Sequence, residues 1–359
     1  MRGDAMTTDR TAERPQAEAE RALRRFFFIL LDRFSLLPFA GAVDTLRLAN
    51  RHAAEAGLTA PPCRWKTIAS GGPRPVESSA GVTIAASAGF EALGGGGDGP
   101  SLGSRDTVIV CGGLDVREHA ADRALLATLR RAHRAGARIG AICTGAEILA
   151  AAGLLENRRA TIHWENRDSF AELHPEVTLA DTVYAVDGRL VTSAGGTAAI
   201  DLMLRLIAED HGAAGETLAT TLADQMIHTQ IRTESDMQRL SIPTRIGVRH
   251  PRLARVLQRM EETLEEPLSP ATLAAEVGLS TRQLERLFRR YLGRSPKRYY
   301  MELRLARARK LLLQSDMSVI DVAMACGFTS PSHFSKCYRA QYGITPYRER
   351  GIDRRSRAE

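Results

Sequence analysis

The sequence predicts two domains of different class: an α/β sandwich built on a parallel sheet, followed by an all-α domain with two helix-turn-helix units. Between residues 25 and 211, short β-branched and aromatic runs alternate with helical patterns. Such alternation is typical of a parallel sheet covered on both faces. Between residues 271 and 346, one pattern of glycine, apolar and proline positions occurs twice. A chain of 359 residues is long enough for both domains.

The expected elements of the α/β domain follow from hydrophobic periodicity and from turn residues. Strands are expected at 25–31, 64–70, 107–111, 138–142, 159–164, 183–186 and 190–192. Helices are expected at 38–56, 117–135, 145–152 and 197–209, with a further helix from 218 to about 237. A glycine-rich stretch at 89–104 is expected to be a flexible loop.

Domain boundaries follow from changes in composition. We expect a disordered tail over 1–24, because this stretch is polar, charged and short of large apolar residues. The α/β domain is expected over 25–213, a helix and interdomain linker over 214–249, the helix-turn-helix domain over 250–350 and a basic tail over 351–359. Pro243 and Gly247 mark 241–249 as the linker itself.

Composition limits the class of protein. The apolar run nearest the N-terminus covers only 26–31 and is followed at once by Asp32 and Arg33, so it cannot span a bilayer. The five cysteines are odd in number and include no C-x-x-C pair, which argues against a disulfide framework and a zinc site. We therefore expect a cytoplasmic protein without membrane contact, metal or cofactor.

The repeated pattern has the layout of a helix-turn-helix. In the first copy a helix at 271–277 ends at Gly278, and Ser280 caps a second helix at 281–291. In the second copy Gly327 forms the turn, Thr329 or Ser330 is the cap, and the helix runs over 331–342. Leu284, Leu287, Phe288 and Tyr291 form the predicted buried stripe of the first recognition helix, and Phe334, Cys337 and Tyr338 that of the second.

The opposite faces of both helices carry donors suited to base edges and phosphates. The candidate DNA-binding residues are Arg282, Gln283, Glu285, Arg286 and Arg289 in the first helix and Ser332, His333, Ser335, Lys336 and Arg339 in the second. Charge agrees, because 249–359 holds 22 Lys and Arg against 12 Asp and Glu, a net +10, whereas the whole chain is +7 and residues 1–248 are therefore −3. A helix at 297–313 would separate the two recognition helices by roughly 25 Å.

Residues 334–346 read Phe-Ser-Lys-Cys-Tyr-Arg-Ala-Gln-Tyr-Gly-Ile-Thr-Pro. This run resembles the C-terminal signature of the AraC/XylS family of transcription regulators, and the resemblance extends over about 249–350. It implies binding to double-stranded promoter DNA and contact with RNA polymerase, with activation the more common outcome. A helical bundle with a charged face is the plain alternative, but it does not explain two turns with matched glycines and prolines.

Ala141-Ile-Cys143-Thr-Gly145 places a cysteine between small residues where a predicted strand meets a helix. This is the arrangement of a nucleophile elbow, with cysteine in place of serine. The start of the following helix would direct N–H groups at the sulfur and stabilise a thiolate or a bound anion.

The motifs 108–113, 140–145, 160–163 and 190–196 resemble the DJ-1/PfpI branch of the class I glutamine amidotransferase-like superfamily, which has a flavodoxin-like sandwich. In that family the elbow cysteine can act with a histidine about twenty residues later, as His163 follows Cys143, although a satisfied core histidine is the alternative. Two departures weaken catalysis. Thr144 stands where some members have histidine, and Pro38 aligns with the family's glutamate. We therefore predict no catalytic residue.

The combination of the two domains resembles the GlxA-like regulators, whose first domain is taken to be a retired enzyme pocket that senses a metabolite. The candidate effector-binding residues are Gly112, Gly113, Cys143, Thr144, His163 and Trp164. The resemblance implies a small-molecule effector, with an amino acid or a quaternary amine as the candidate classes, and a homodimer. A thiol-redox regulator acting through Cys143, and a bifunctional regulator with residual DJ-1-type hydrolase or hydratase activity, stay open as alternatives.

Overall fold

The computed structural model describes residues 23–58, 62–94, 102–238 and 250–356, which divide into two compact units. The first unit takes in the residues through Trp164 together with His174–Gln238. The second takes in Glu165–Leu173 together with the C-terminal part of the chain, so 165–173 groups with the helix-turn-helix region although it lies within the predicted α/β domain. Residues 1–22 of the expected tail, residues 95–101 of the glycine-rich stretch and the linker at 241–249 lie outside the described residues.

A six-stranded sheet forms the centre of the first unit, in the order β2-β1-β5-β6-β10-β9. Its strands are β1 (Arg24–Leu30), β2 (Cys63–Ile68), β5 (Asp106–Cys111), β6 (Arg138–Ile142), β9 (Tyr184–Asp187) and β10 (Leu190–Ser193). All neighbouring pairs are parallel except β9 and β10, which are antiparallel. The mainly parallel α/β fold is confirmed, and the antiparallel edge strand arises because β9 and β10 are joined by a tight turn at Gly188, which has φ +61°.

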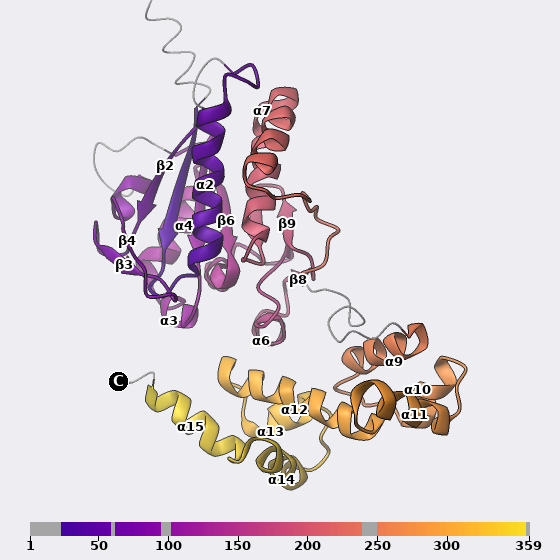
Figure 1. Cartoon of the computed structure of the whole chain (residues 1–359). Coiled ribbons are helices and arrows are strands. Elements are labelled where there is room, and N and C mark those ends of the chain that lie inside the picture. The colour runs from indigo at the N-terminus through magenta and orange to yellow at the C-terminus, as the bar shows by residue number, and fades with distance from the viewer. Residues whose placement is uncertain (1–22, 59–61, 95–101, 239–249, 357–359) are drawn as a thin grey trace, which may run out of the picture. The chain divides into compact units, whose positions relative to one another are not determined.

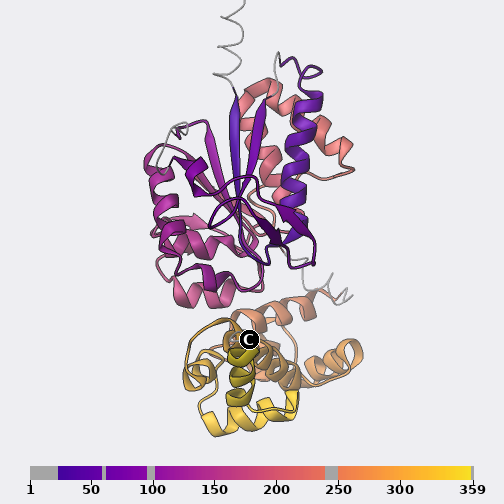
Figure 2. The same ribbon diagram turned by 90° about the vertical axis from the view of Figure 1, so that its left-hand side faces the viewer.

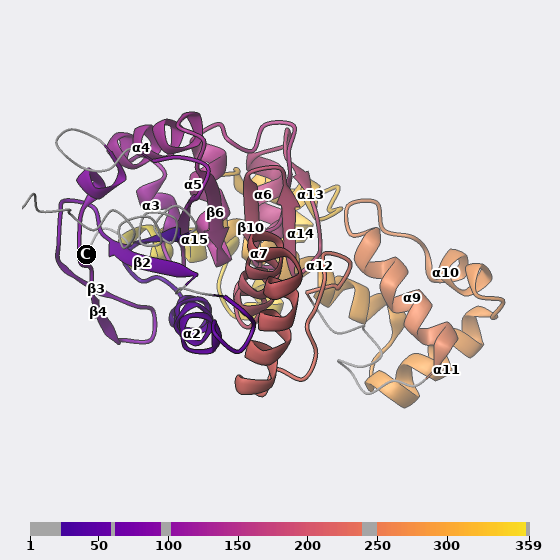
Figure 3. The same cartoon turned by 90° about the horizontal axis from the view of Figure 1, so that it is seen from above.

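Helices cover both faces of this sheet, as Figures 1, 2 and 3 show. On one face α2 (Leu36–His52) lies beside α7 (Ala198–Gln225), and on the other lie α3 (Val116–His119), α4 (Arg123–Arg134) and α5 (Ala146–Ala151). The central strands β1 and β5 are accordingly apolar on both sides over most of their length, and β5 is buried along its whole length. The sandwich thereby fixes the carboxyl ends of β1, β5 and β6, where the elbow lies.

Several predicted elements have other bounds. The expected helix at 117–135 is divided into α3 and α4, because Asp122 accepts hydrogen bonds from Ala124 N and Leu125 N and so starts a new helix. The expected strand at 159–164 is reduced to β7 (Arg159–Ala160), which pairs with β8 (Thr178–Leu179) in a separate two-stranded sheet. An unpredicted hairpin of β3 (Pro75–Glu77) and β4 (Thr83–Ala85) and the short helix η1 (Phe90–Leu93) lie in stretches expected to be irregular.

The predicted helix from 218 to about 237 is wrong beyond Gln225. The chain leaves the helix at Ile227, which has φ +53°, and turns back along the start of α7. Asp201, fully buried in α7, accepts hydrogen bonds from His228 Nε2 at 2.7 Å and from Arg232 N at 2.8 Å. These contacts between residues about thirty positions apart outweigh the local helical preference.

The second unit consists of α6 (Arg167–Leu173), α9 (Pro251–Glu262), α10 (Pro270–Glu276), α11 (Thr281–Leu292), α12 (Pro296–Gln314), α13 (Val319–Ala325), α14 (Pro331–Tyr342) and α15 (Pro346–Ser356). One apolar cluster joins α9, α10 and α11, a second joins α12, α13 and α14, and α12 contributes to both (Figure 1). The helix α15 continues to Ser356, so the first part of the expected basic tail is helical. No helix among the described residues has the length and apolar character to cross a membrane.

Candidate functional site

The first candidate site is formed by the two helix-turn-helix units, α10–α11 and α13–α14. Gly278 and Gly327 lie in the turns with φ +65° and +71°. A Cβ on Gly327 would lie 2.6 Å from the backbone oxygen of Glu265, so this turn requires glycine for its close approach as well as for its backbone conformation. The predicted turns are therefore confirmed, and both recognition helices start at the expected residues.

The first recognition helix begins with a capping box. Ser280 Oγ accepts from Gln283 N at 3.2 Å, and Gln283 Oε1 accepts from Ser280 N at 2.8 Å. The side-chain oxygen of Gln283 is thus used within the capping box, and only the side-chain NH₂ group is available toward DNA. Recognition of an adenine edge by both groups of the amide would require the oxygen as well. In the second helix the cap is Ser330, whose Oγ accepts from His333 N at 3.3 Å.

The recognition helices present most of the predicted side chains to solvent. Leu284, Phe288, Phe334 and Tyr338 are buried as expected, but the predicted burial of Tyr291 is wrong: it lies one turn beyond Phe288 and is 39% exposed. Nine of the ten candidate DNA-binding residues are exposed, and Ser335 is half-buried. A hollow of about 680 Å³ on the outer face of α11 is lined by Ser280 and by all five first-helix candidates, Arg282, Gln283, Glu285, Arg286 and Arg289.

Replacing Arg286 by Ala should weaken binding to the preferred DNA sequence by roughly 1–3 kcal/mol, because we expect its guanidinium to contact a guanine edge. The measurement is a fluorescence-anisotropy titration with the preferred and with a scrambled duplex. Arg290→Ala is the matched control, since it removes the same charge from the same helix outside the hollow. Equal losses on both duplexes would show that Arg286 contacts only phosphate.

The second candidate site is the elbow between β6 and the short helix η2 (Cys143–Gly145). Cys143 has φ +61°, the left-handed conformation expected of a strained nucleophile elbow, and is 8% exposed. Its neighbours approach too closely for side chains. A Cβ on Gly112 would lie 2.3 Å from Gly145 N, and a Cβ on Gly195 would lie 2.9 Å from the Cβ of Cys143.

Hydroxyl groups and backbone atoms surround the elbow. Ser35 Oγ donates to Cys143 Sγ at 3.3 Å, and Ser35 N donates to Gly112 O at 3.0 Å. Thr144 Oγ1 donates to Gly113 O at 2.7 Å, so the structure brings together four of the six predicted effector residues, Gly112, Gly113, Cys143 and Thr144. Ser35 precedes the first residue of α2, yet its side chain does not cap that helix, which leaves it for the sulfur.

Sequence reasoning missed Ser35 and Gly195. The expected start of α2 at Pro38 concealed Ser35, although a serine directly before a helix is a usual capping signal. Pro38 is buried in the first turn of α2. Gly195 belongs to the quoted motif at 190–196, but nothing local predicts that it packs on the cysteine.

His163 and Trp164 directly follow Thr161 and Ile162, which form hydrogen bonds with the part of the chain that follows α7. Their rings lie 5.6 Å apart at an interplanar angle of 36°, and both side chains are half-buried. Gln238 Nε2 donates to Thr161 Oγ1 and to Ile162 O, both at 2.9 Å. That the two rings complete the wall beside Cys143 stays a prediction.

Three other cysteines are buried, and burial raises their thiol pKa. The pKa of Cys63 rises to about 12, and that of Cys326 rises to about 12, in both cases chiefly through loss of hydration. Cys111 is raised in pKa by burial and, to a smaller extent, by Cys143. Such thiols are protonated at neutral pH and are poor nucleophiles.

A buried thiol elbow in an α/β sandwich and two helix-turn-helix units on one chain define a DNA-binding regulator that carries an additional α/β domain. Residues 24–209 match the family model described as "DJ-1/PfpI family", and residues 273–351 match the model described as "Helix-turn-helix domain". The chain is 41% identical to "HTH-type transcriptional regulator CdhR" of Pseudomonas aeruginosa over 91% of each chain. It is 38% identical to "HTH-type transcriptional regulator GlxA" of Rhizobium meliloti over 91% of this chain and 95% of the relative.

The chain belongs to the DJ-1/PfpI family and, within it, to the GlxA-like regulators of AraC type. Among solved structures it is similar to an AraC family transcriptional regulator from Pseudomonas putida, with 26% identity, a TM-score of 0.47, and coverage of 56% of this chain and 99% of that one. The chain is therefore a DNA-binding transcription regulator.

Proposed function

We propose that a small polar metabolite, bound beside Cys143, controls the affinity of this regulator for promoter DNA. The observation that carries the proposal is the elbow itself, where a left-handed Cys143 is closely surrounded by Gly112 and Gly195 and accepts a hydrogen bond from the Ser35 hydroxyl. The two glycines let the backbone pack closely around the elbow.

Binding without turnover is the better-supported use of this site. Covalent catalysis by a thiol needs a neighbouring base and a group that orients it. The Ser35 hydroxyl can donate to the sulfur but is not a base at neutral pH, and Pro38 stands at the position that aligns with the family's glutamate. We therefore propose that the α/β domain binds its ligand without turning it over, so that the protein acts as a regulator and not as an enzyme.

The chemistry of the site suggests the class of effector. Open α/β sheets bind ligands at the carboxyl ends of their strands, where glycines allow backbone N–H groups to approach a carboxylate. An amino acid or a quaternary amine carrying a carboxylate would meet these groups, and Trp164 would offer an aromatic face to its cation. Binding alters DNA affinity only through different affinity for two arrangements of the protein.

Combining Cys143→Ser with His163→Ala should lower reporter induction by the effector while DNA binding without effector stays at the wild-type level. Both changes act on the proposed wall, and neither lies in the recognition helices. Arg47→Ala, which breaks an exposed ion pair with Asp44 on α2, is the control for expression. Unchanged induction in the double variant would show that the elbow is not the sensor.

A thiol-redox regulator is the second candidate, favoured by the Ser35 hydroxyl, because donation to the sulfur stabilises the thiolate form. A peroxide would oxidise the Cys143 thiolate to a sulfenic acid and be reduced to water or an alcohol. If the protein is a redox regulator, Cys143→Ser should abolish the change in reporter expression caused by peroxide. If it is a metabolite sensor, reporter expression should respond to the effector whether or not peroxide is present.

The remaining parts of the proposal concern assembly and outcome. We propose a homodimer that binds two DNA half-sites in the cytoplasm, contacts RNA polymerase and activates transcription. The dimer is expected from the resemblance to families whose members commonly pair, and it would present four helix-turn-helix units. Light scattering of a monomer at tens of micromolar protein would contradict the dimer without affecting the effector site.

A further inference from the structure

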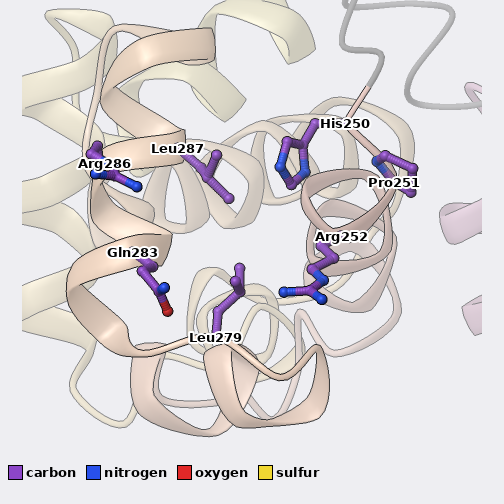
Figure 4. A pocket seen from close by; sticks show the side chains of 7 residues that line it. All are labelled: His250, Pro251, Arg252, Leu279, Gln283, Arg286 and Leu287. Carbon is purple, nitrogen blue, oxygen red and sulfur yellow. The ribbon is translucent and has the colours of Figure 1, made fainter.

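A second hollow lies on the flank of the first recognition helix, beside the start of α9. It measures about 300 Å³ and is bounded by His250 and Arg252 from α9, Leu279 from the turn, and Gln283, Arg286 and Leu287 from α11. Figure 4 shows Arg252 and His250 on one side of this opening and Gln283 and Arg286 on the other, with the two leucines between them. The hollow therefore brings together residues more than thirty positions apart in the sequence.

The lining of this hollow is suited to an anion. Arg252 and Arg286 are both exposed, and neither forms an ion pair with the part of the chain that the structure describes. None of the residues that line the hollow is acidic. Arg252 Nη1 reaches Gly278 O at 3.4 Å, a long contact that leaves the other guanidinium N–H groups available.

The hollow is continuous with the face of α11 that meets DNA. Gln283 and Arg286 line both this hollow and the larger one on the outer face of the helix. A duplex seated against Arg282, Arg286 and Arg289 therefore brings its backbone to the edge of the smaller hollow. Phosphates are the anions that DNA presents at regular intervals along such an edge.

We propose that the hollow binds one phosphate of the DNA backbone beside the bases that α11 faces, with Arg252 as the principal ligand and His250 next to it. Arginine presents a planar fork of N–H donors that matches two phosphate oxygens. The proposal rests on the DNA-binding function and adds to it a contact from α9, outside both helix-turn-helix units. Because Arg286 borders both hollows, Arg252 is the residue whose change tests this site alone.

The test uses the full chain and a duplex that the wild-type protein selects from a random-sequence pool, with a scrambled duplex beside it. Arg252→Ala should weaken binding to both duplexes by the same factor, roughly tenfold, because a charge-assisted hydrogen bond is lost without loss of sequence information. The slope of log K against log salt should fall by about 0.9, the value for one phosphate. Arg255→Ala is the matched control, since it removes the same charge from an exposed position of α9 that does not line the hollow.

A second measurement locates the phosphate. Single methylphosphonates, which remove one backbone charge each, are scanned along the selected duplex. One position should weaken wild-type binding several-fold and have no effect on Arg252→Ala. The proposal is overturned if Arg255→Ala weakens DNA binding as much as Arg252→Ala does, or if no methylphosphonate position loses its effect in Arg252→Ala. If the hollow then binds only free inorganic phosphate, it is a site for a small anion and not for the DNA backbone. Failure of the wild-type protein to prefer its selected duplex would contradict sequence-specific regulation instead, and the two failures are distinguishable.

Discussion

Replacing Phe334 by Ala should destabilise the second helix-turn-helix unit by about 3–5 kcal/mol, the largest effect we expect from a single apolar change. Phe334 is fully buried, and its ring centroid lies 5.0 Å from that of Phe328 and 5.5 Å from that of Tyr338. The cavity left behind would remove contacts from α12, α13 and α14 together. Because the total stability of a small domain is 5–15 kcal/mol, DNA binding should be strongly reduced at 37 °C.

The measurement is urea unfolding followed by two probes. Both tryptophans, Trp65 and Trp164, belong to the first unit, so tryptophan fluorescence reports that unit, whereas far-UV circular dichroism also reports the helices of the second. Phe334→Ala should move the circular-dichroism transition and leave the fluorescence midpoint unchanged. Phe334→Leu, which keeps most of the apolar volume, should lose far less. A shift of the fluorescence midpoint equal to that of the dichroism would show that the two units unfold together.

Replacing Asp201 by Ala should destabilise the first unit by about 2–4 kcal/mol, somewhat less than a fully buried ion pair because Arg232 is 26% exposed and can reach water. Asp201 is fully buried, and its Oδ2 accepts from Arg232 Nε at 2.9 Å and from Arg232 Nη2 at 2.6 Å. The substitution would leave Arg232, His228 and the backbone N–H of Arg232 without this acceptor. The segment 226–238 should then open before the rest of the unit.

Tryptophan-detected urea unfolding measures the loss, and hydrogen exchange of residues 226–238 shows whether opening is local. Asp44→Ala is the control, because Asp44 and Arg47 form an ion pair in which both side chains are about half-exposed, and its loss should cost under about 1 kcal/mol. Similar losses in the two variants would contradict a structural role for the Asp201 cluster.

The sequence determined the features that depend on local patterns. Gly278, Gly327 and Ser280 could be assigned from spacing, because a left-handed turn and a helix cap each need a particular residue at one position. The parallel core strands could be found because strands buried on both faces are continuous apolar runs, as in β1 and β5. The elbow at Cys143 was also predictable from a local pattern, because small residues flank the cysteine at the end of a strand.

Only the tertiary structure decided the features that depend on contacts distant in sequence. Ser35 donates a hydrogen bond to Cys143, which lies 108 positions away in the sequence. Asp201 accepts a hydrogen bond from Arg232 and so holds the chain after α7 in a non-helical conformation. Arg252 joins Arg286 at one hollow although α9 carries no local signal for anion binding. Spacing shows what one element prefers, but the partner of a hydroxyl, a buried carboxylate or a guanidinium is chosen when elements pack, and the free energy of those contacts exceeds local propensity.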